Sequence, residues 1–433
     1  MTVVRPTFFA PFSIRSFRFQ WPADLFASWA FEMEVLILGW YVLVESESVL
    51  LLVVFGALQY AGSLISPLFG VAGDRMGYRR LFMITRFLYA LLSILLVVLA
   101  ACNLLTPLIV LVIAAISGMI KPSDIMMRFA LIAQTLPSNQ MIGALGLSRV
   151  TTDSARIAGA LAGVGVFALF GLIPAYIFVT CLYLVSCLLA SGVAPDPRRN
   201  HPAATSHSPT PTDLSAAAPR KRSTPYQDLL QAFGYVWRKP ELLGAFCLAF
   251  LVNILAYPLF LGLLPFVAKN VYEIGQAGLG LLGASYAAGS LLGSVVVSLN
   301  RFSVGPSRLM LISAVLWFAI DLAFAQTTLM PVGIVLLICA GFAQNVCLVP
   351  LAGVMLKASD PAYRGRVMGM RMLAIWGLPM GLMLSGPLIN QFGFSVTATV
   401  YSILGLLFTV AIGVRWRHIL WSRQAAVNSN MSG

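Results

Sequence analysis

Charged residues are scarce in this sequence. Only 10% of its 433 residues are Asp, Glu, Lys or Arg, whereas 59% are hydrophobic. A soluble protein usually carries roughly a quarter charged residues, which cover its water-facing surface. The composition therefore excludes an ordinary soluble enzyme and indicates a polytopic membrane protein. The 28 basic residues outnumber the 15 acidic ones, but they lie between long apolar runs, so we expect no nucleic-acid partner.

Residues that build catalytic and metal centres are also few. The six cysteines lie inside apolar stretches with no CxxC pair, so they are expected to pack as small hydrophobic side chains. His201, His207 and His418 have no carboxylate or cysteine at metal-ligand spacing. No phosphate-binding loop motif is present, so ATP is not expected to drive the protein directly. We therefore expect no enzyme activity, no metal and no cofactor.

The apolar runs have the length of membrane-spanning helices. A bilayer core needs about 20 apolar residues per helix, and these runs are too long and too uniform for the strands of a barrel. The predicted spans are Trp21–Val44, Val49–Gly73, Leu81–Cys102, Pro107–Phe129, Arg149–Gly171, Pro174–Val193, Glu241–Leu264, Gly275–Leu299, Ser307–Gln326, Met330–Leu356, Val367–Ile389 and Phe394–Val414.

Lysine and arginine in the loops predict how the spans are oriented. One alternate set of loops is strongly basic, whereas the other holds only Lys269, beside Glu45, Glu47 and Glu273. By the positive-inside rule, both termini and the central linker face the cytoplasm. No cleavable signal peptide precedes Trp21, so the first helix is expected to direct insertion. We expect a multi-pass protein of a bacterial-type cytoplasmic membrane, with the bilayer as partner.

A polar segment divides the chain into two halves. Pro195–Pro225 is rich in Pro, Ser, Thr and Ala and predicts a flexible linker. Tyr226–Lys239 then predicts an amphipathic helix on the inner membrane surface, which we favour as an ordinary pre-span helix over a partner-binding site. The expected organisation is an N-terminal segment (1–20), a six-helix bundle (21–193), the linker with its helix (194–240), a second bundle (241–415) and a tail (416–433).

The two halves repeat a pattern of small residues. Gly56-Ala57 followed by Ala61–Leu64 in the second span matches Gly283-Ala284 followed by Ala288–Leu291 in the eighth. Pseudo-symmetric halves are typical of secondary transporters, which bind substrate between the repeats near the membrane midplane. Small residues allow close approach and sliding of helices, and tight packing alone explains them equally well. The predicted fold class is an all-α membrane protein of twelve helices in two pseudo-symmetric bundles.

The loop after the second span carries a recognisable motif. The segment Gly70–Arg80, GVAGDRMGYRR, resembles the loop signature of the major facilitator superfamily at each signature position. The resemblance, which runs from about Phe17 to about Val414, implies the major facilitator fold. It also implies a latch that closes the cytoplasmic side, formed by Gly70, Asp74, Arg75, Gly77, Arg79 and Arg80. A short basic loop would explain the arginines but not the spaced glycines and aspartate. The matching stretch of the second half, 300–308, lacks the acidic residue.

Further segments are similar to one branch of this superfamily. Leu38–Leu43 and Arg364–Gly369 look most like the enterobactin-exporter and macrolide-efflux branch, and Arg156–Gly163 is similar to that branch's fifth-span motif. Ala158-Gly159-Ala160 stands where the antiporter motif of the family commonly has Gly-Pro, and this departure weakens the implication of antiport.

Ionisable residues inside a span cost several kcal/mol and are candidates for function. Glu32 and Glu34 are about 200° apart on the first helix, so one is expected to line a cavity while the other faces a neighbouring helix. Burial disfavours the charged form of a carboxyl group, so either glutamate is a candidate proton carrier, and Asp321 is a second candidate site. A structural hydrogen bond or ion pair is the alternative for each single residue.

Polar residues in other spans complete the set of candidates. Asp124 and Arg128, at i and i+4, predict an intrahelical salt bridge. Asp153 and Arg156 predict part of the cytoplasmic gate. The substrate-cavity candidates are Lys121, Asn253, Tyr257, Gln344, Asn345 and Trp376. Lys121 is expected to meet a first-span glutamate or an anionic substrate.

We therefore expect a secondary transporter that exports a small amphipathic molecule, such as a drug or a siderophore, in exchange for protons. Its partners are the substrate and protons, and we expect a monomer. An importer or facilitator for a metabolite or lysolipid is the alternative within the same fold. A non-transporting scaffold or sensor, binding partners through the linker, is the alternative from another class.

Overall fold

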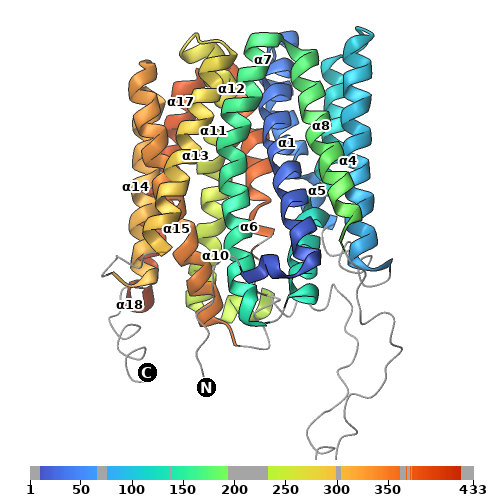
Figure 1. The fold of residues 1–433 in the computed structure, drawn as a ribbon. Coiled ribbons are helices and arrows are strands. Elements are labelled where there is room, and N and C mark those ends of the chain that lie inside the picture. The colour runs from blue at the N-terminus through green and yellow to red at the C-terminus, as the bar shows by residue number, and fades with distance from the viewer. Residues whose placement is uncertain are drawn as a thin grey trace, which may run out of the picture.

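The computed structural model describes residues 10–65, 76–136, 138–193, 233–298, 304–360 and 373–420, together with Val367 and Arg371. These form a bundle of roughly parallel helices (Figure 1). The N-terminal half contains α1 (Arg15–Ser46), α2 (Val49–Leu58), α4 (Tyr78–Ala101), α5 (Pro107–Thr135), α6 (Ser138–Ala158), α7 (Val164–Phe170) and α8 (Leu172–Ser191). The C-terminal half contains α10 (Pro240–Leu251), α11 (Tyr257–Leu261), α12 (Leu264–Phe266), α13 (Gln276–Ser298), α14 (Pro306–Gln326), α15 (Met330–Ala358), α17 (Gly377–Arg415) and α18 (Arg417–Leu420).

Ten helices in the described part of the chain are long and apolar enough to cross a membrane. Two further predicted spans are accounted for differently. The span from Val49 begins as α2 and the short helix η2 (Ala61–Ile65) and then runs beyond the described residues. Helix α17 holds two predicted spans, because Gly393 breaks it with φ 81° and ψ 167°. At about 1.5 Å per residue, its 39 residues would be far too long for one crossing of the bilayer.

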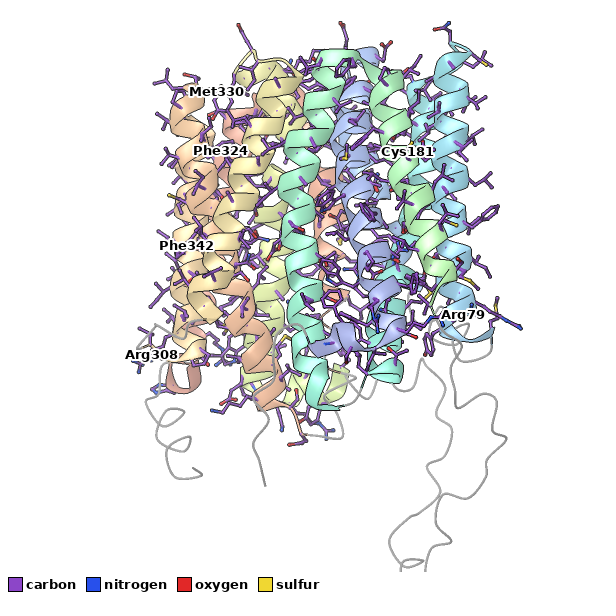
Figure 2. The ribbon with its side chains drawn as sticks, viewed as in Figure 1. Arg79, Cys181, Arg308, Phe324, Met330 and Phe342 are labelled. Carbon is purple, nitrogen blue, oxygen red and sulfur yellow. The ribbon has the colours of Figure 1, made fainter. Side chains whose placement is uncertain are left out.

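The loops at one end of the bundle are tight turns. Glu47, Asn103, Gly171, Glu273 and Gly393 all have φ between 50° and 82° in these turns. A left-handed residue reverses the chain within a few residues, so consecutive spans can lie side by side. The opposite end carries α18 and the side chains of Arg79 and Arg308, whereas Met330 lies at the tight-turn end (Figures 1 and 2).

The repeated small residues pack equivalent helices in the two halves. A Cβ on Gly62 would overlap the backbone of Gly118 and Met119 in α5, and a Cβ on Gly289 would overlap the backbone of Ile338 in α15. The motif of the second span therefore packs against the fourth, and that of the eighth against the tenth. Close backbone approach at small residues is a common way for helices to associate in a membrane.

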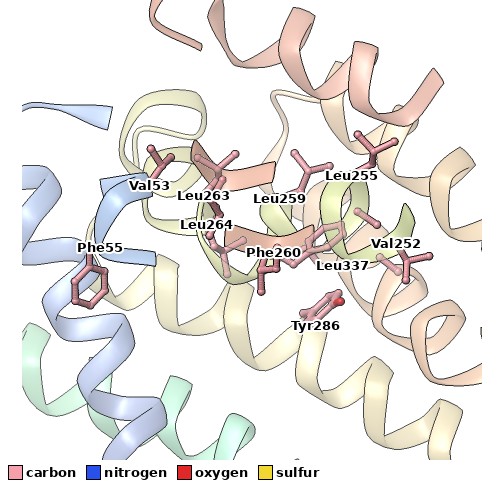
Figure 3. Packing of buried hydrophobic residues seen from close by; sticks show 14 of the residues in the cluster. Val53, Phe55, Val252, Leu255, Leu259, Phe260, Leu263, Leu264, Tyr286 and Leu337 are labelled. Carbon is pink, nitrogen blue, oxygen red and sulfur yellow. The ribbon is translucent and has the colours of Figure 1, made fainter. Parts of the chain in front are cut away.

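The halves meet along two seams. In one, α2 packs against α17; in the other, α13 packs against α6, α7 and the π-helical turn η3 (Gly159–Gly163). Gly280 approaches the carbonyl oxygen of Ala160 in the second seam. The apolar core includes Phe260 and Tyr286, whose rings stack at 4.7 Å (Figure 3). The cavity described below adjoins the second seam, because α6 contributes to both.

The segment before the seventh span is only partly described. Residues 194–232, which include the predicted linker, lie outside the described residues, and residues 233–238 are helical. Val236 of this helix is buried, whereas Phe233 and Trp237 are 49% and 63% exposed and their rings stack at 5.7 Å. Two exposed apolar rings on one helix are typical of a helix that lies on a membrane surface.

Candidate functional site

A cavity of about 120 Å³ lies within the N-terminal half. Five helices contribute its walls, and the side chains facing it are mainly charged or aromatic. The lining residues are Ala27, Ser28, Phe31, Glu32, Arg86, Tyr89, Lys121, Asp124, Arg128, Thr152, Ala155 and Tyr183. Such a mixture of apolar walls with a few convergent polar groups is typical of small-molecule sites.

A buried network of four charges forms one wall of the cavity. Arg86 on α4 contacts Asp24 on α1 at 2.6 Å and Asp124 on α5 at 2.8 Å. Arg128 on α5 lies 3.5 Å from Asp24 and 3.9 Å from Asp124. The side chain of Arg86 is 1% exposed. Two cations and two carboxylates balance, which is the condition under which charges are tolerated in a membrane interior.

This network contains the local pairing expected for the fourth span and adds contacts between helices. The intrahelical contact between Asp124 and Arg128 is present, but it is the longest of the four, and the shorter contacts cross between helices. Asp24 and Arg86 were not among the sequence candidates. Both could have been found by the rule applied to the glutamates, because each is an ionisable residue inside a predicted span. Which charges pair across helices is decided only by the packing.

The two glutamates of the first helix face different neighbours. Glu32 lines the cavity, and its Oε1 lies 3.8 Å from Nε of Arg156. Glu34 is buried and accepts a hydrogen bond of 2.7 Å from the Tyr183 hydroxyl on α8. A Cβ on Gly159 would come within 2.7 Å of the Glu32 Cβ, so the missing side chain at Gly159 lets α6 approach α1. Of the pair, Glu32 is the one that a substrate or water in the cavity can reach.

Arg156 lies at the junction of the two halves. It lies in the last turn of α6, just before the π-helical turn η3, and such turns frequently mark functional sites. Besides Glu32 it interacts electrostatically with Tyr257 and Tyr286 of the C-terminal half and with Asp153, which is buried on its own helix. The sequence placed Arg156 and Asp153 in the cytoplasmic gate; the structure sets Arg156 beside Glu32 at the cavity.

Lys121 projects its ammonium group onto two aromatic rings. Nζ lies 3.6 Å from the centre of the Phe31 ring and 4.9 Å from that of Tyr60. Among the described residues, no carboxylate lies within 4.0 Å of it. The aromatic faces attract the cation without neutralising its charge.

The polar candidates of the C-terminal half bond mainly to one another and to backbone. Gln344 Nε2 donates to the Tyr257 hydroxyl at 2.6 Å, and Tyr257 packs edge-on against Trp317. Asn345 Nδ2 donates to the carbonyl oxygen of Ser290, and Asn253 Nδ2 to that of Ala249. Of these candidates, Tyr257 interacts electrostatically with Arg156 of the N-terminal half.

Asp321 on α14 is fully buried. Neither of its carboxylate oxygens has a hydrogen-bond partner among the described residues, and Tyr286 is close enough to interact with it electrostatically. Trp376, another candidate, is half-buried, and its indole N–H also has no partner in the described part of the chain.

Comparison with known proteins identifies the family. The model of the Major Facilitator Superfamily matches residues 25–382. The chain belongs to the major facilitator superfamily. Members of this superfamily are multi-pass membrane transporters that bind small-molecule substrates and often ions, and they are not enzymes in general. A comparison with curated protein sequences gives no match.

Solved structures share the major facilitator fold with this chain. The nucleoside transporter NupG is similar with a TM-score of 0.70 at 14% identity, covering 91% of this chain and 99% of that one. A D-xylose-proton symporter gives 0.70 at 13%, covering 91% and 96%. The human organic anion transporter MFSD10 gives 0.60 at 17%, covering 91% and 98%. The fold class expected from the sequence is confirmed, and identities this low show the fold alone.

The latch motif of the superfamily is only partly visible. Gly70, Asp74 and Arg75 lie outside the described residues. Gly77 has φ 90° and caps α4, a conformation that favours glycine. Arg79 donates a hydrogen bond of 3.3 Å to the carbonyl oxygen of Ser191 at the end of α8, and Arg80 is exposed. Arg79 thus ties the third span to the sixth, and the latch role stays a prediction.

An exposed clasp joins the linker helix to the end of the tenth span. Asp360 accepts a hydrogen bond of 2.8 Å from the Tyr235 hydroxyl. It also forms a hydrogen-bonded ion pair of 3.1 Å with Lys239. These hydrogen bonds lower the pKa of the Asp360 carboxyl below its ordinary value of 3.8. A lowered carboxyl pKa stabilises the contact above that ordinary value, and the contribution is lost as the pH falls through the folded pKa.

Asp360→Asn is expected to loosen this clasp without changing global stability, because exposed ion pairs contribute little. Amide hydrogen exchange of residues 233–239 at pH 7 should quicken, and wild type should approach the exchange of the variant only at a pH below about 4. Thermal unfolding should be unchanged. Equal exchange in both proteins at pH 7 would contradict the assignment.

Proposed function

We propose that this protein is a proton-coupled secondary transporter, and that Glu32 carries the proton. The observation that supports this best is the position of Glu32, a half-buried carboxylate that lines the cavity and lies 3.8 Å from Arg156. The distance is long for an ion pair, so the pair is weaker than the contacts of Arg86 with Asp24 and Asp124. A carboxylate inside a span that is open to a cavity and loosely paired is a functional candidate by default.

Protonation of Glu32 would act on both halves through Arg156. When the carboxylate is neutral, the guanidinium loses its nearest anion, and the polar groups within its electrostatic reach include Tyr257 and Tyr286 of the C-terminal half. A proton that changes the partners of a residue at the junction changes which arrangement of the halves is favoured. Alternating access would follow as rocking of the halves about the cavity.

The same proposal includes the other expected roles. The end carrying Arg79, Arg308 and α18 faces the cytoplasm of a bacterial-type cell, because basic loops are retained on that side. The loop containing Asp74 closes that side. Asp321 is proposed as a second proton site, supported by its full burial without a hydrogen-bond partner in the described part of the chain.

Two directions of transport are candidates. Export of a drug or siderophore-like molecule is supported by the segments that resemble the enterobactin-exporter and macrolide-efflux branch. Import of a metabolite is supported by a specific feature of the cavity, the cation of Lys121 with no carboxylate within 4.0 Å among the described residues. We favour import, because Lys121 lines the cavity, whereas no described residue of the segments that resemble the exporter branch does so.

Glu32→Gln is expected to lower the substrate accumulation that a pH gradient drives by roughly tenfold or more. A factor of this size corresponds to a typical coupling free energy between two bound ligands. The full chain is reconstituted in vesicles, and a substrate found by thermal-shift screening of nucleosides, sugars, siderophores, antibiotics and carboxylic acids is followed. Substrate exchange without a gradient should continue, since the variant mimics the protonated state.

Glu45→Gln is the matched control, because Glu45 is an exposed carboxylate at the end of the same helix. It should leave gradient-driven transport intact. Asp321→Asn in the same assay tests the second proton site. Flux that ignores the gradient in wild type, or that responds equally in wild type and Glu32→Gln, would refute proton coupling by Glu32.

A further inference from the structure

In the part of the chain that the structure describes, Lys121 is a cavity-lining cation with no carboxylate at ion-pair distance. Arg86 and Arg128 contact Asp24 and Asp124, and Arg156 contacts Glu32. Lys121 lines the same cavity, and among the described residues no carboxylate comes within 4.0 Å of its ammonium. A buried cation without an anion is costly and persists where function requires it.

The ammonium is held in place. Its position 3.6 Å above the Phe31 ring and 4.9 Å from the Tyr60 ring fixes its direction, and rings contribute attraction without net negative charge. The rings do not neutralise the ammonium, so it can still pair with an anionic ligand, on a side chain already oriented toward the cavity. Because the Lys121 side chain is already ordered, less of the binding free energy is lost in fixing it when a ligand binds.

The charges around the cavity indicate the ligand that fits. Arg86, Arg128 and Arg156 each lie within 4.0 Å of Asp24, Asp124 or Glu32, whereas Lys121 has no carboxylate at that distance among the described residues. Two further carboxyl groups are buried nearby: Glu34 accepts a hydrogen bond from Tyr183, and Asp153 interacts electrostatically with Arg156. An anionic group on a ligand in the cavity would give Lys121 a direct ion pair. The other walls, Phe31, Tyr89 and Tyr183, suit an apolar or aromatic body.

We propose that Lys121 anchors the carboxylate of a small organic anion with an apolar or aromatic body, which is cotransported with a proton. This inference rests on the proposed function and gives it a substrate class and a direction. The anion would take the place beside Lys121 that no side chain of the described residues fills.

The coupling follows from the position of Glu32. The charged groups facing its carboxyl group are Arg156 on α6 and Lys121 on α5, and Tyr60 interacts with it electrostatically. A proton on Glu32 removes one negative charge, so two cations then attract the anion instead of one. By linkage, a bound anion equally favours the proton. Anion and proton therefore bind together and move in the same direction, whereas a cationic substrate would compete with the proton.

The test uses matched probes on the full-length purified protein. Each set shares one body and differs in charge: benzoate, benzamide and benzylamine; 2-naphthoate, 2-naphthamide and 2-naphthylmethylamine; octanoate, octanamide and octylamine. Binding is measured by thermal shift and calorimetry at pH 7. At least one carboxylate should bind more tightly than its amide and amine.

Lys121→Gln should weaken carboxylate binding roughly 10- to 100-fold, the range for a lost hydrogen bond to a charged group. Lys121→Arg should retain most of the binding, and Lys269→Gln, a lysine near the opposite end of the bundle from Arg79, should retain all of it. Glu32→Gln, which removes a negative charge near Lys121, should bind the carboxylate more tightly than wild type does. Size-exclusion profiles confirm that each variant is folded.

The outcomes separate this inference from the proposed function. Preference for an amine or an amide, no carboxylate binding at all, or carboxylate binding unchanged by Lys121→Gln overturns the anion site. If gradient-driven flux of another substrate is still lost in Glu32→Gln, proton coupling stands without it. Carboxylate binding that needs Lys121, with flux indifferent to the gradient, keeps the anchor and overturns the coupling and the cotransport.

Discussion

Arg86→Met is expected to destabilise the protein by about 3–5 kcal/mol, the cost of breaking a buried ion pair by removing one partner. Arg86 makes the shortest contacts with both Asp24 and Asp124. Without it, two carboxylates share Arg128, whose distances to them are 3.5 Å and 3.9 Å. Thermal unfolding in detergent, followed by the fraction that remains monodisperse, measures the loss.

Two variants make this result specific. Arg79→Met removes an arginine from the end of the same helix, where the surroundings are wetter, and should cost far less. The double variant Arg86→Met/Asp124→Asn restores the charge balance and should recover much of the lost stability, because the penalty comes from the unpaired carboxylate. Equal unfolding of Arg86→Met and Arg79→Met would show that the network does not stabilise the bundle.

Gly289→Leu is expected to destabilise the C-terminal half by about 3 kcal/mol, at the upper end of overpacking effects. A Cβ at Gly289 would overlap the carbonyl oxygen of Ile338, which belongs to the backbone of α15 and cannot rotate away. The helices would have to separate, with loss of their packing contacts. Thermal unfolding and expression of the monodisperse protein report the effect.

Gly353→Leu is the matched control, because it lies on α15, is exposed, and a Cβ there meets nothing within 4 Å. It should unfold as wild type does. Gly62→Leu should repeat the Gly289 defect, since Gly62 packs against α5 as Gly289 packs against α15. If Gly289→Leu unfolds at the wild-type temperature, close packing of α13 on α15 does not depend on the small-residue motif.

Much of the fold followed from local pattern. The apolar runs located the helices, and the glycine motifs of the two halves predicted equivalent packing. The two last spans were predicted as separate helices, and the structure agrees: Gly393 breaks α17 into two helices with a sharp turn between them. Span length is set by the bilayer and can be read from hydropathy, whereas turn geometry depends on single residues.

The candidate site was less predictable. Glu32 and Glu34 are equivalent in sequence terms, and only the packing of α6 and α8 around α1 separates a cavity residue from one bonded to Tyr183. Lys121 was a candidate for two partners; the structure sets its ammonium on the rings of Phe31 and Tyr60 and within electrostatic reach of Glu32, and contact with a substrate stays a prediction.

The sequence by itself determined that the chain is a membrane protein of the major facilitator fold, because hydropathy, helix length and the loop motif are local properties. Only the tertiary structure decided which buried charges lie close enough to neutralise one another. Ion pairs join residues more than 60 positions apart, such as Asp24 with Arg86. Electrostatic attraction depends on distance in space, and that distance exists only once the helices have packed.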